Sequence, residues 1–189
     1  HASRAPSGSN RQPVRYVVLT DGPRAVQAKS LLGDAFRAGW AAKLRTDGYR
    51  DGTGAEAGSP KARMAATMQH YVDHIEHVPA IVLVCMVRYR DPSPYEGASV
   101  YPACQNLLLA ARALGYGGVL TTWQRACEPE LRDVLGIPDD VFLAATITLA
   151  LSLAECSVKI RSGGPDDDPA DLVDPVHSRA WGGHVPLVH

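Results

Sequence analysis

The sequence predicts an α+β protein in which helices flank a central β-sheet. Two apolar runs, residues 78–87 and 141–151, have the composition of strands buried on both faces. Between residues 24 and 43, apolar side chains recur every three or four positions, as in an amphipathic helix. A chain of 189 residues suits one domain, and its 46% hydrophobic content is enough for a core. We therefore expect a single domain over residues 1–189.

Shorter patterns predict the remaining elements. A strand is expected over residues 14–19, because Val and Tyr favour strands and the turn Asp21-Gly22-Pro23 ends the run. A second short strand is expected over residues 119–123, after the helix-breaking glycines at 115–118. Further helices are expected over residues 61–77, 99–114 and 128–135. Residues 46–60 are rich in glycine and charge, so we expect a mobile loop there.

Composition excludes several classes of function. The net charge of −1 argues against nucleic-acid or anionic-membrane binding, and no apolar run approaches the roughly 20 residues that cross a bilayer. The four cysteines are widely spaced and form no Cys-x-x-Cys pair, which favours reduced structural thiols. We therefore expect a cytoplasmic protein whose partners include neither nucleic acid nor membrane.

Three histidines lie close together in the predicted helix 61–77. His70 and His74 are four residues apart and share a face, so two metal ligands are geometrically possible. However, the helix has no His-Glu-x-x-His motif, and no third ligand is identifiable nearby. We interpret these histidines as solvated or capping residues and predict no metal site.

The segment of residues 5–13 has more hydrogen-bonding side chains than a turn requires. Pro6, Ser7, Gly8, Ser9 and Asn10 are turn formers, and Gly8 allows a ligand to approach the backbone closely. The segment can equally be read as a hydrophilic surface turn before a strand, and turn chemistry alone leaves both interpretations open.

Two stretches of the chain resemble the nitroreductase-like flavoproteins. Residues 5–13 resemble the family segment Ala-Pro-Ser-Gly-x-Asn-x-Gln-Pro, and residues 101–111 resemble its dimer helix, which contains a Gln-Asn pair. The likeness continues through residues 115–122 and 135–138. It implies the nitroreductase-like fold: an FMN-dependent homodimer with a central mixed β-sheet and a swapped C-terminal arm, here residues 165–189.

The resemblance also implies which residues bind FMN. Loop residues that would hold the polar edge of the isoalloxazine are Pro6, Ser7, Gly8, Ser9, Asn10 and Gln12. The strand end at Thr121 and Thr122 would donate to flavin N5, although a Thr-Thr pair is also explained by strand propensity. Lys159 and Arg161 would bind the phosphate, the alternative being an exposed basic edge strand.

Two further features concern the phosphate. Relatives carry a helical segment with an Arg-Arg-Ser-type phosphate motif before the loop, and the sequence begins at His1 without it, so we expect an N-terminally truncated member. After the apolar run 78–87, Arg88 and Arg90 could steer an anionic cofactor or form a solvated rim.

The function implied is that of an oxidoreductase. NADH or NADPH would reduce the flavin, which would then reduce a small-molecule acceptor such as a nitroaromatic or a quinone. No protein side chain is assigned as catalytic, because the flavin carries the hydride chemistry. Two alternatives stay open: a non-catalytic, flavin-storing or sensing member, and a dehalogenase or flavin-fragmenting relative.

The helix 99–114 is apolar on much of its circumference, so we expect a second copy of the chain to cover it.

Overall fold

The structure is a computed structural model that describes residues 2–151. Lys159, Arg161 and the expected arm at 165–189 lie outside these residues. The strands are β1 (Val14–Leu19), β2 (Ala80–Val87), β3 (Tyr116–Thr121) and β4 (Val141–Leu151). The α-helices are α1 (Pro23–Thr46), α2 (Pro60–His74), α3 (Gly97–Ala113) and α4 (Glu128–Leu135). Short 3-10 helices are η1 (Ala2–Arg4), η2 (Gly8–Asn10), η3 (Gly52–Gly54), η4 (Ile75–His77) and η5 (Trp123–Cys127).

The four strands form one sheet in the order β1-β2-β4-β3. We expected a mixed sheet, but every strand pairing within residues 2–151 is antiparallel. The reason lies in the connection between β1 and β2, which contains two successive helices. A single crossover helix returns the chain parallel to its first strand, whereas α1 followed by α2 reverses it once more. Strands β2 and β3 run in the same direction, but β4 lies between them.

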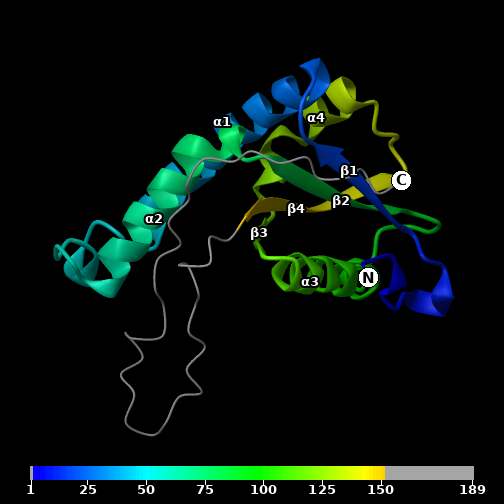
Figure 1. Cartoon of the computed structure of the whole chain (residues 1–189), viewed down its shortest axis with the longest axis horizontal. Coiled ribbons are helices and arrows are strands. Elements are labelled where there is room, and N and C mark those ends of the chain that lie inside the picture. The colour runs from blue at the N-terminus through cyan, green and yellow to red at the C-terminus, as the bar shows by residue number, and fades with distance from the viewer. Residues whose placement is uncertain (1, 152–189) are drawn as a thin grey trace, which may run out of the picture.

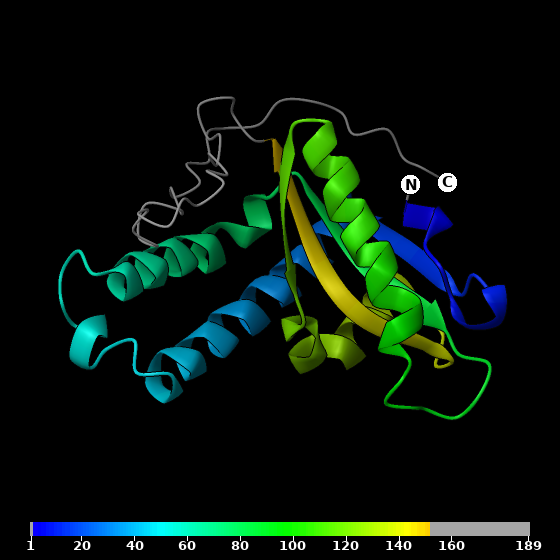
Figure 2. The same cartoon turned by 90° about the horizontal axis from the view of Figure 1, so that it is seen from below.

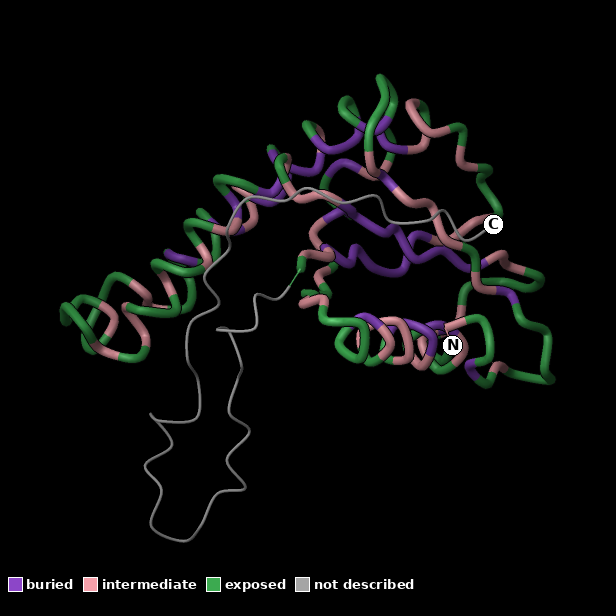
Figure 3. The backbone as a smooth tube through the Cα atoms, viewed as in Figure 1, coloured by how far each residue is buried: buried purple, intermediate pink, exposed green. Residues whose placement is uncertain are grey.

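Helices cover the two faces of the sheet unequally (Figures 1 and 2). Helices α1 and α4 pack on one face, together with the C-terminal end of α2, while α3 packs on the other. The central strands β2 and β4 are buried between these layers (Figure 3). The α1–α2 hairpin extends past the sheet (Figure 2). None of the helices between residues 2 and 151 combines the length and the hydropathy that a membrane span requires.

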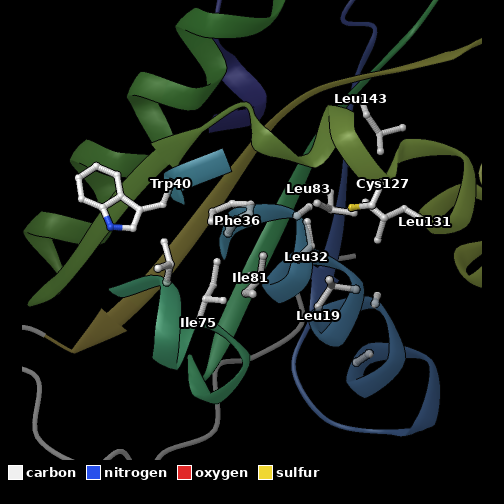
Figure 4. Packing of buried hydrophobic residues seen from close by; sticks show 14 of the residues in the cluster. Leu19, Leu32, Phe36, Trp40, Ile75, Ile81, Leu83, Cys127, Leu131 and Leu143 are labelled. Atoms are coloured by element: carbon white, nitrogen blue, oxygen red, sulfur yellow. The ribbon is translucent and has the colours of Figure 1, made fainter. Parts of the chain in front are cut away.

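The larger core lies between α1 and the sheet (Figure 4). Phe36 is fully buried there, with its ring 5.2 Å from that of Trp123 in an edge-on arrangement and 6.2 Å from that of Tyr71. Offset and edge-on aromatic pairs add stability beyond the area that they bury. This aromatic cluster joins α1, α2 and the turn that follows β3.

The cysteines of the described chain are buried and unpaired, as expected. Cys85, Cys104 and Cys127 are free thiols, and burial raises the pKa of each to about 11. Because the thiolate is the reactive form, these side chains act as small apolar core residues. Cys156 lies outside the described residues.

The predicted strand 119–123 is displaced towards the N-terminus. Strand β3 begins at Tyr116 and ends at Thr121, and Trp123 starts the 3-10 helix η5. The helix does end before these glycines, and Gly115 lies in the turn with a φ of 85°, but Gly117 and Gly118 belong to the strand. A Cβ on Gly118 would lie 2.7 Å from Cδ2 of Leu108 and 2.9 Å from Cδ2 of Leu149, so a larger residue would force these leucines to move.

A partly buried hydrogen bond between two hydroxyls makes the free energy of unfolding depend on pH in the alkaline range. The hydroxyl of Tyr71 lies 3.1 Å from Oγ1 of Thr148, and burial raises the pKa of Tyr71 to about 12. The folded state therefore retains a proton that the unfolded state loses near the ordinary pKa of about 10. This contribution is complete below pH 10, and about 2–3 kcal/mol is lost as the pH rises to 12.

Replacing Tyr71 by Phe should remove this dependence. At pH 8 we expect the variant to be less stable by about 1 kcal/mol, because Thr148 loses its partner. Between pH 10 and 12 the stability of Tyr71→Phe should fall less steeply than that of the wild type. Urea unfolding at several pH values measures both slopes, and parallel curves would contradict the assignment. The other tyrosines, including Tyr16, are common to both proteins and cancel in the comparison.

Candidate functional site

The loop before β1 has an unusual backbone. The backbone φ angles of Ser9, Asn10 and Gln12 are 53°, 51° and 51°. They lie in the left-handed region, which residues other than glycine rarely adopt. Each such residue costs on the order of 1 kcal/mol or more. Strained backbone of this kind clusters at ligand-binding sites, which favours the binding interpretation of the loop over a plain surface turn.

Hydrogen bonds hold this conformation. The backbone N–H of Gln12 donates to Oγ of Ser7 at 2.9 Å, and Nε2 of Gln12 donates to Oδ1 of Asn10 at 3.1 Å and to the carbonyl of Ala5 at 3.2 Å. The N–H of Gly8 donates to Oγ of Ser99 on α3 at 3.0 Å. The structure thus brings the predicted loop residues together, preformed and anchored to α3; they are Pro6, Ser7, Gly8, Ser9, Asn10 and Gln12.

Two hollows adjoin the loop. One is a cavity of about 150 Å³ between the loop, η1 and α3, and its lining includes Ser7, Gln12 and Ala103. The other is more open and is lined by Ser3, Arg4, Asn10 and Gln12. Gln12 lines both hollows, so the loop presents amide and hydroxyl groups to open space on two sides.

The second predicted group of site residues lies at the end of β3. Thr121 pairs with Thr146 of β4, and its Oγ1 is buried without a hydrogen-bond partner among the described residues. Thr122 follows it, exposed, just before η5. Buried hydroxyls almost always have partners, so the Thr121 hydroxyl is available to a group that residues 2–151 do not provide.

The strand end is fixed by residues that sequence reasoning missed. Gln124 is fully buried; its Nε2 donates to the carbonyl of Leu143 at 3.4 Å, and its Oε1 accepts from Oγ1 of Thr146 at 3.2 Å. Trp123 packs against Gly39 of α1, where a Cβ would lie 3.2 Å from the indole. The only sequence signal was a polar residue next to a tryptophan after a strand, which did not indicate burial.

Within one chain, the predicted loop residues and the threonines at the end of β3 do not meet. The loop leads into β1, whereas Thr121 lies on β3, and these strands are the two edges of the described sheet. Two strands intervene, so the edges are about 14 Å apart at a strand spacing of about 4.8 Å. Helix α3 connects the regions: Ser99 near its start contacts the loop, and Leu108 near its end packs on Gly118 of β3.

The arginines after β2 differ in their surroundings. Arg88 forms a two-pronged ion pair with Glu96, at 3.0 Å for Nε–Oε1 and 3.1 Å for Nη2–Oε2, and hydrogen bonding to Glu96 raises the pKa of Arg88. Because Glu96 occupies its fork, the structure favours a structural role for Arg88 over one that steers a cofactor. Arg90 instead lies 5.3 Å from the ring centroid of Tyr89.

The outer face of α3 carries exposed apolar side chains. Tyr101, Leu109 and Leu114 are 43%, 58% and 74% exposed, and Gln105 is exposed between the first two. Leu108 faces the sheet instead, against Gly118. Within residues 2–151 nothing covers this stripe, which has the character of a surface that binds another protein.

Comparison with known proteins identifies relatives of this chain. The model of the Nitroreductase family matches residues 1–150. One similar structure, from Desulfovibrio desulfuricans, is assigned as a nitroreductase in complex with FMN. The two sequences are 23% identical, and the TM-score of the two structures is 0.53. The match covers 78% of this chain and 66% of that one. The chain therefore spans just under two thirds of that relative's length.

Two other structures align over nearly the whole chain. The FMN and NADPH-dependent nitroreductase NfnB from Sphigopyxis sp. strain HMH is 21% identical, with a TM-score of 0.50 over 97% of this chain and 86% of that one. An iodotyrosine deiodinase bound to FMN and 3-iodo-L-tyrosine is 20% identical, with a TM-score of 0.51 over 97% and 80%. At these identities the likeness establishes the fold.

Proposed function

Because this chain belongs to the nitroreductase family, we propose that it is an FMN-dependent oxidoreductase acting on a small molecule. Bound FMN supplies the hydride chemistry, and the protein supplies position and electrostatics. The proposed reductant is NADH or NADPH, and the proposed acceptor is a nitroaromatic, a quinone or a similar compound. The observation that carries the proposal is the strained polar loop at Ser9, Asn10 and Gln12, whose amide and hydroxyl groups suit the polar edge of a flavin.

A homodimer would complete the site. Helix α3 contacts the loop through Ser99 near its start and strand β3 through Leu108 towards its other end. When two copies of such a helix pack antiparallel about a two-fold axis, the start of each lies beside the end of the other. The loop of one protomer then approaches β3 of its partner, so one ligand can contact residues of both protomers. The exposed stripe of Tyr101, Leu109 and Leu114 provides the apolar contact for this packing.

Each group then has a role. Ser7, Asn10 and Gln12 would hydrogen-bond the pyrimidine edge, and the hydroxyl of Thr121 or the backbone beside Thr122 would donate to flavin N5. Trp123 and Gln124 keep that strand end in place through Gly39 and Leu143. Outside the described residues, Lys159 and Arg161 remain proposed phosphate ligands. We also propose a cytoplasmic location, which the buried free thiols support.

A visible spectrum tests this function. The purified full chain, titrated with FMN, should quench flavin fluorescence and acquire a protein-bound flavin absorption. That absorption should bleach on addition of NADPH or NADH and return when an acceptor such as a quinone is added. Protein that binds FMN but never bleaches with either nucleotide would favour a storage or sensing role. Protein that leaves FMN fluorescence unchanged would contradict the proposal.

A further inference from the structure

Two arginines converge on one tyrosine beside the strained loop. The guanidinium carbon of Arg11 lies 4.2 Å from the ring centroid of Tyr89, and that of Arg90 lies 5.3 Å from it. Tyr89 is close to the loop, since its hydroxyl lies 4.0 Å from where a Cβ on Gly8 would stand. The residues on both sides of Arg11 have left-handed backbone, so the loop conformation itself places this side chain over Tyr89.

Neither arginine has a carboxylate partner in the part of the chain that the structure describes. The ion pairs found there are made by Arg37, Lys43, Arg88 and Arg132. Glu96 pairs with Arg88, and Asp91, the other acid of the loop after β2, forms none of these pairs.

Two guanidinium groups beside one ring concentrate positive charge, and an anion that binds to them would offset their mutual repulsion. A third cation, Arg4, lines the adjoining open hollow together with Asn10 and Gln12. Among the described residues, Arg4, Arg11 and Arg90 therefore give this surface an excess of positive charge that no ion pair neutralises.

We infer that Arg11 and Arg90, braced on Tyr89, form a clamp for a phosphate monoester. The planar guanidinium fork matches phosphate oxygens, and two forks can share the charge of one dianion. The inference rests on the proposed function, because it assigns a partner chemistry to the same loop. Two phosphates qualify by chemistry: the phosphate of FMN, which the clamp would share with the proposed ligands Lys159 and Arg161, and the 2′-phosphate of NADPH. NADH and riboflavin lack these groups and serve as matched ligands.

The test uses the full chain with both arginines replaced, Arg11→Gln with Arg90→Gln. The control variant, Arg24→Gln with Arg45→Gln, removes the same charge from exposed positions on α1. Binding of FMN and riboflavin to flavin-stripped protein is measured by fluorescence quenching at low and high salt. Binding of NADPH and NADH is measured with the FMN-loaded protein by calorimetry under anaerobic conditions.

The result expected is a loss of at least about tenfold for one phosphate-bearing ligand, since a charge-assisted contact has this magnitude. If the clamp holds FMN, the double variant loses FMN affinity and keeps riboflavin affinity. If it holds the reductant, FMN binding is unchanged and NADPH weakens while NADH does not. In both cases the loss should shrink at high salt, and the control variant should match the wild type.

Two results would overturn the clamp. Unchanged affinity for both FMN and NADPH would exclude a role for these arginines. Equal losses for FMN and riboflavin, together with no selective loss of NADPH over NADH, would show that the loop was distorted. Failure of the proposed function is distinguishable, because wild-type protein would then bind neither FMN nor riboflavin. Replacing Tyr89 by Leu provides a second check: it removes the brace while keeping both charges, so it should weaken the same ligand by a smaller factor.

Discussion

Replacing Leu109 by Asp should convert the proposed dimer into a monomer and remove most of the proposed affinity for FMN. Leu109 is 58% exposed on the outer face of α3, so the substitution leaves the core intact. In the proposed dimer, the carboxylate would be buried against the partner without a counter-charge, which costs several kcal/mol. FMN binding should fail as well, because the proposed site lies between the two protomers.

Sedimentation velocity and FMN fluorescence quenching measure these two effects. Val26→Asp is the matched control, because Val26 is 63% exposed on α1 rather than α3; it should remain dimeric and bind FMN. Leu108 would be a misleading position for this test, since it packs on Gly118 of the sheet. A Leu109→Asp protein that stays dimeric would show that another surface forms the interface.

Replacing Phe36 by Ala should lower the free energy of unfolding by about 3–5 kcal/mol, a large fraction of the stability of an ordinary domain. Phe36 is fully buried and contacts the rings of Tyr71 and Trp123. The cavity would lie between three elements that depend on this contact, so little collapse is expected. Tyr71→Phe, by comparison, removes only a hydroxyl.

Urea unfolding at neutral pH measures the change, with Tyr95→Ala as the control. Tyr95 is 77% exposed, so its removal should change the free energy of unfolding by no more than about 0.5 kcal/mol. A cost below about 1.5 kcal/mol for Phe36→Ala would show that the aromatic cluster repacks easily. Phe36 also supports Trp123, which precedes Gln124, the residue that anchors the end of β3. Loss of Phe36 should therefore also weaken FMN binding at that strand end.

Local periodicity predicted most of the elements. The expected helix 24–43 is observed as Pro23–Thr46, and the expected strand 141–151 as Val141–Leu151. These patterns succeed because one buried face imposes a period of 3.6 or 2 on the chain. The loop at residues 5–13 was likewise recognisable, because turn formers and hydrogen-bonding side chains are concentrated there.

Features that depend on distant contacts could not be predicted in this way. The glycine pair Gly117 and Gly118 indicated a break, yet it belongs to β3, against which α3 packs. The antiparallel sheet follows from the reversal made by α2, which no local pattern reports. The burial of Gln124 depends on residues 19 and 22 positions away, and Arg88 pairs with an acid eight positions away across a loop, so composition gave no sign of either.

The strand order has a consequence for synthesis of the chain. Strand β4 is the last described strand to be translated, yet it lies between β2 and β3. The apolar side chains of β2 therefore have no neighbour on that edge until residue 151 has left the ribosome. During this interval the nascent chain presents an open, aggregation-prone edge of the kind that chaperones bind. A pause before residue 141 has left the ribosome would prolong that exposure, whereas a pause after residue 151 has left it would allow β4 to pair with β2 and β3.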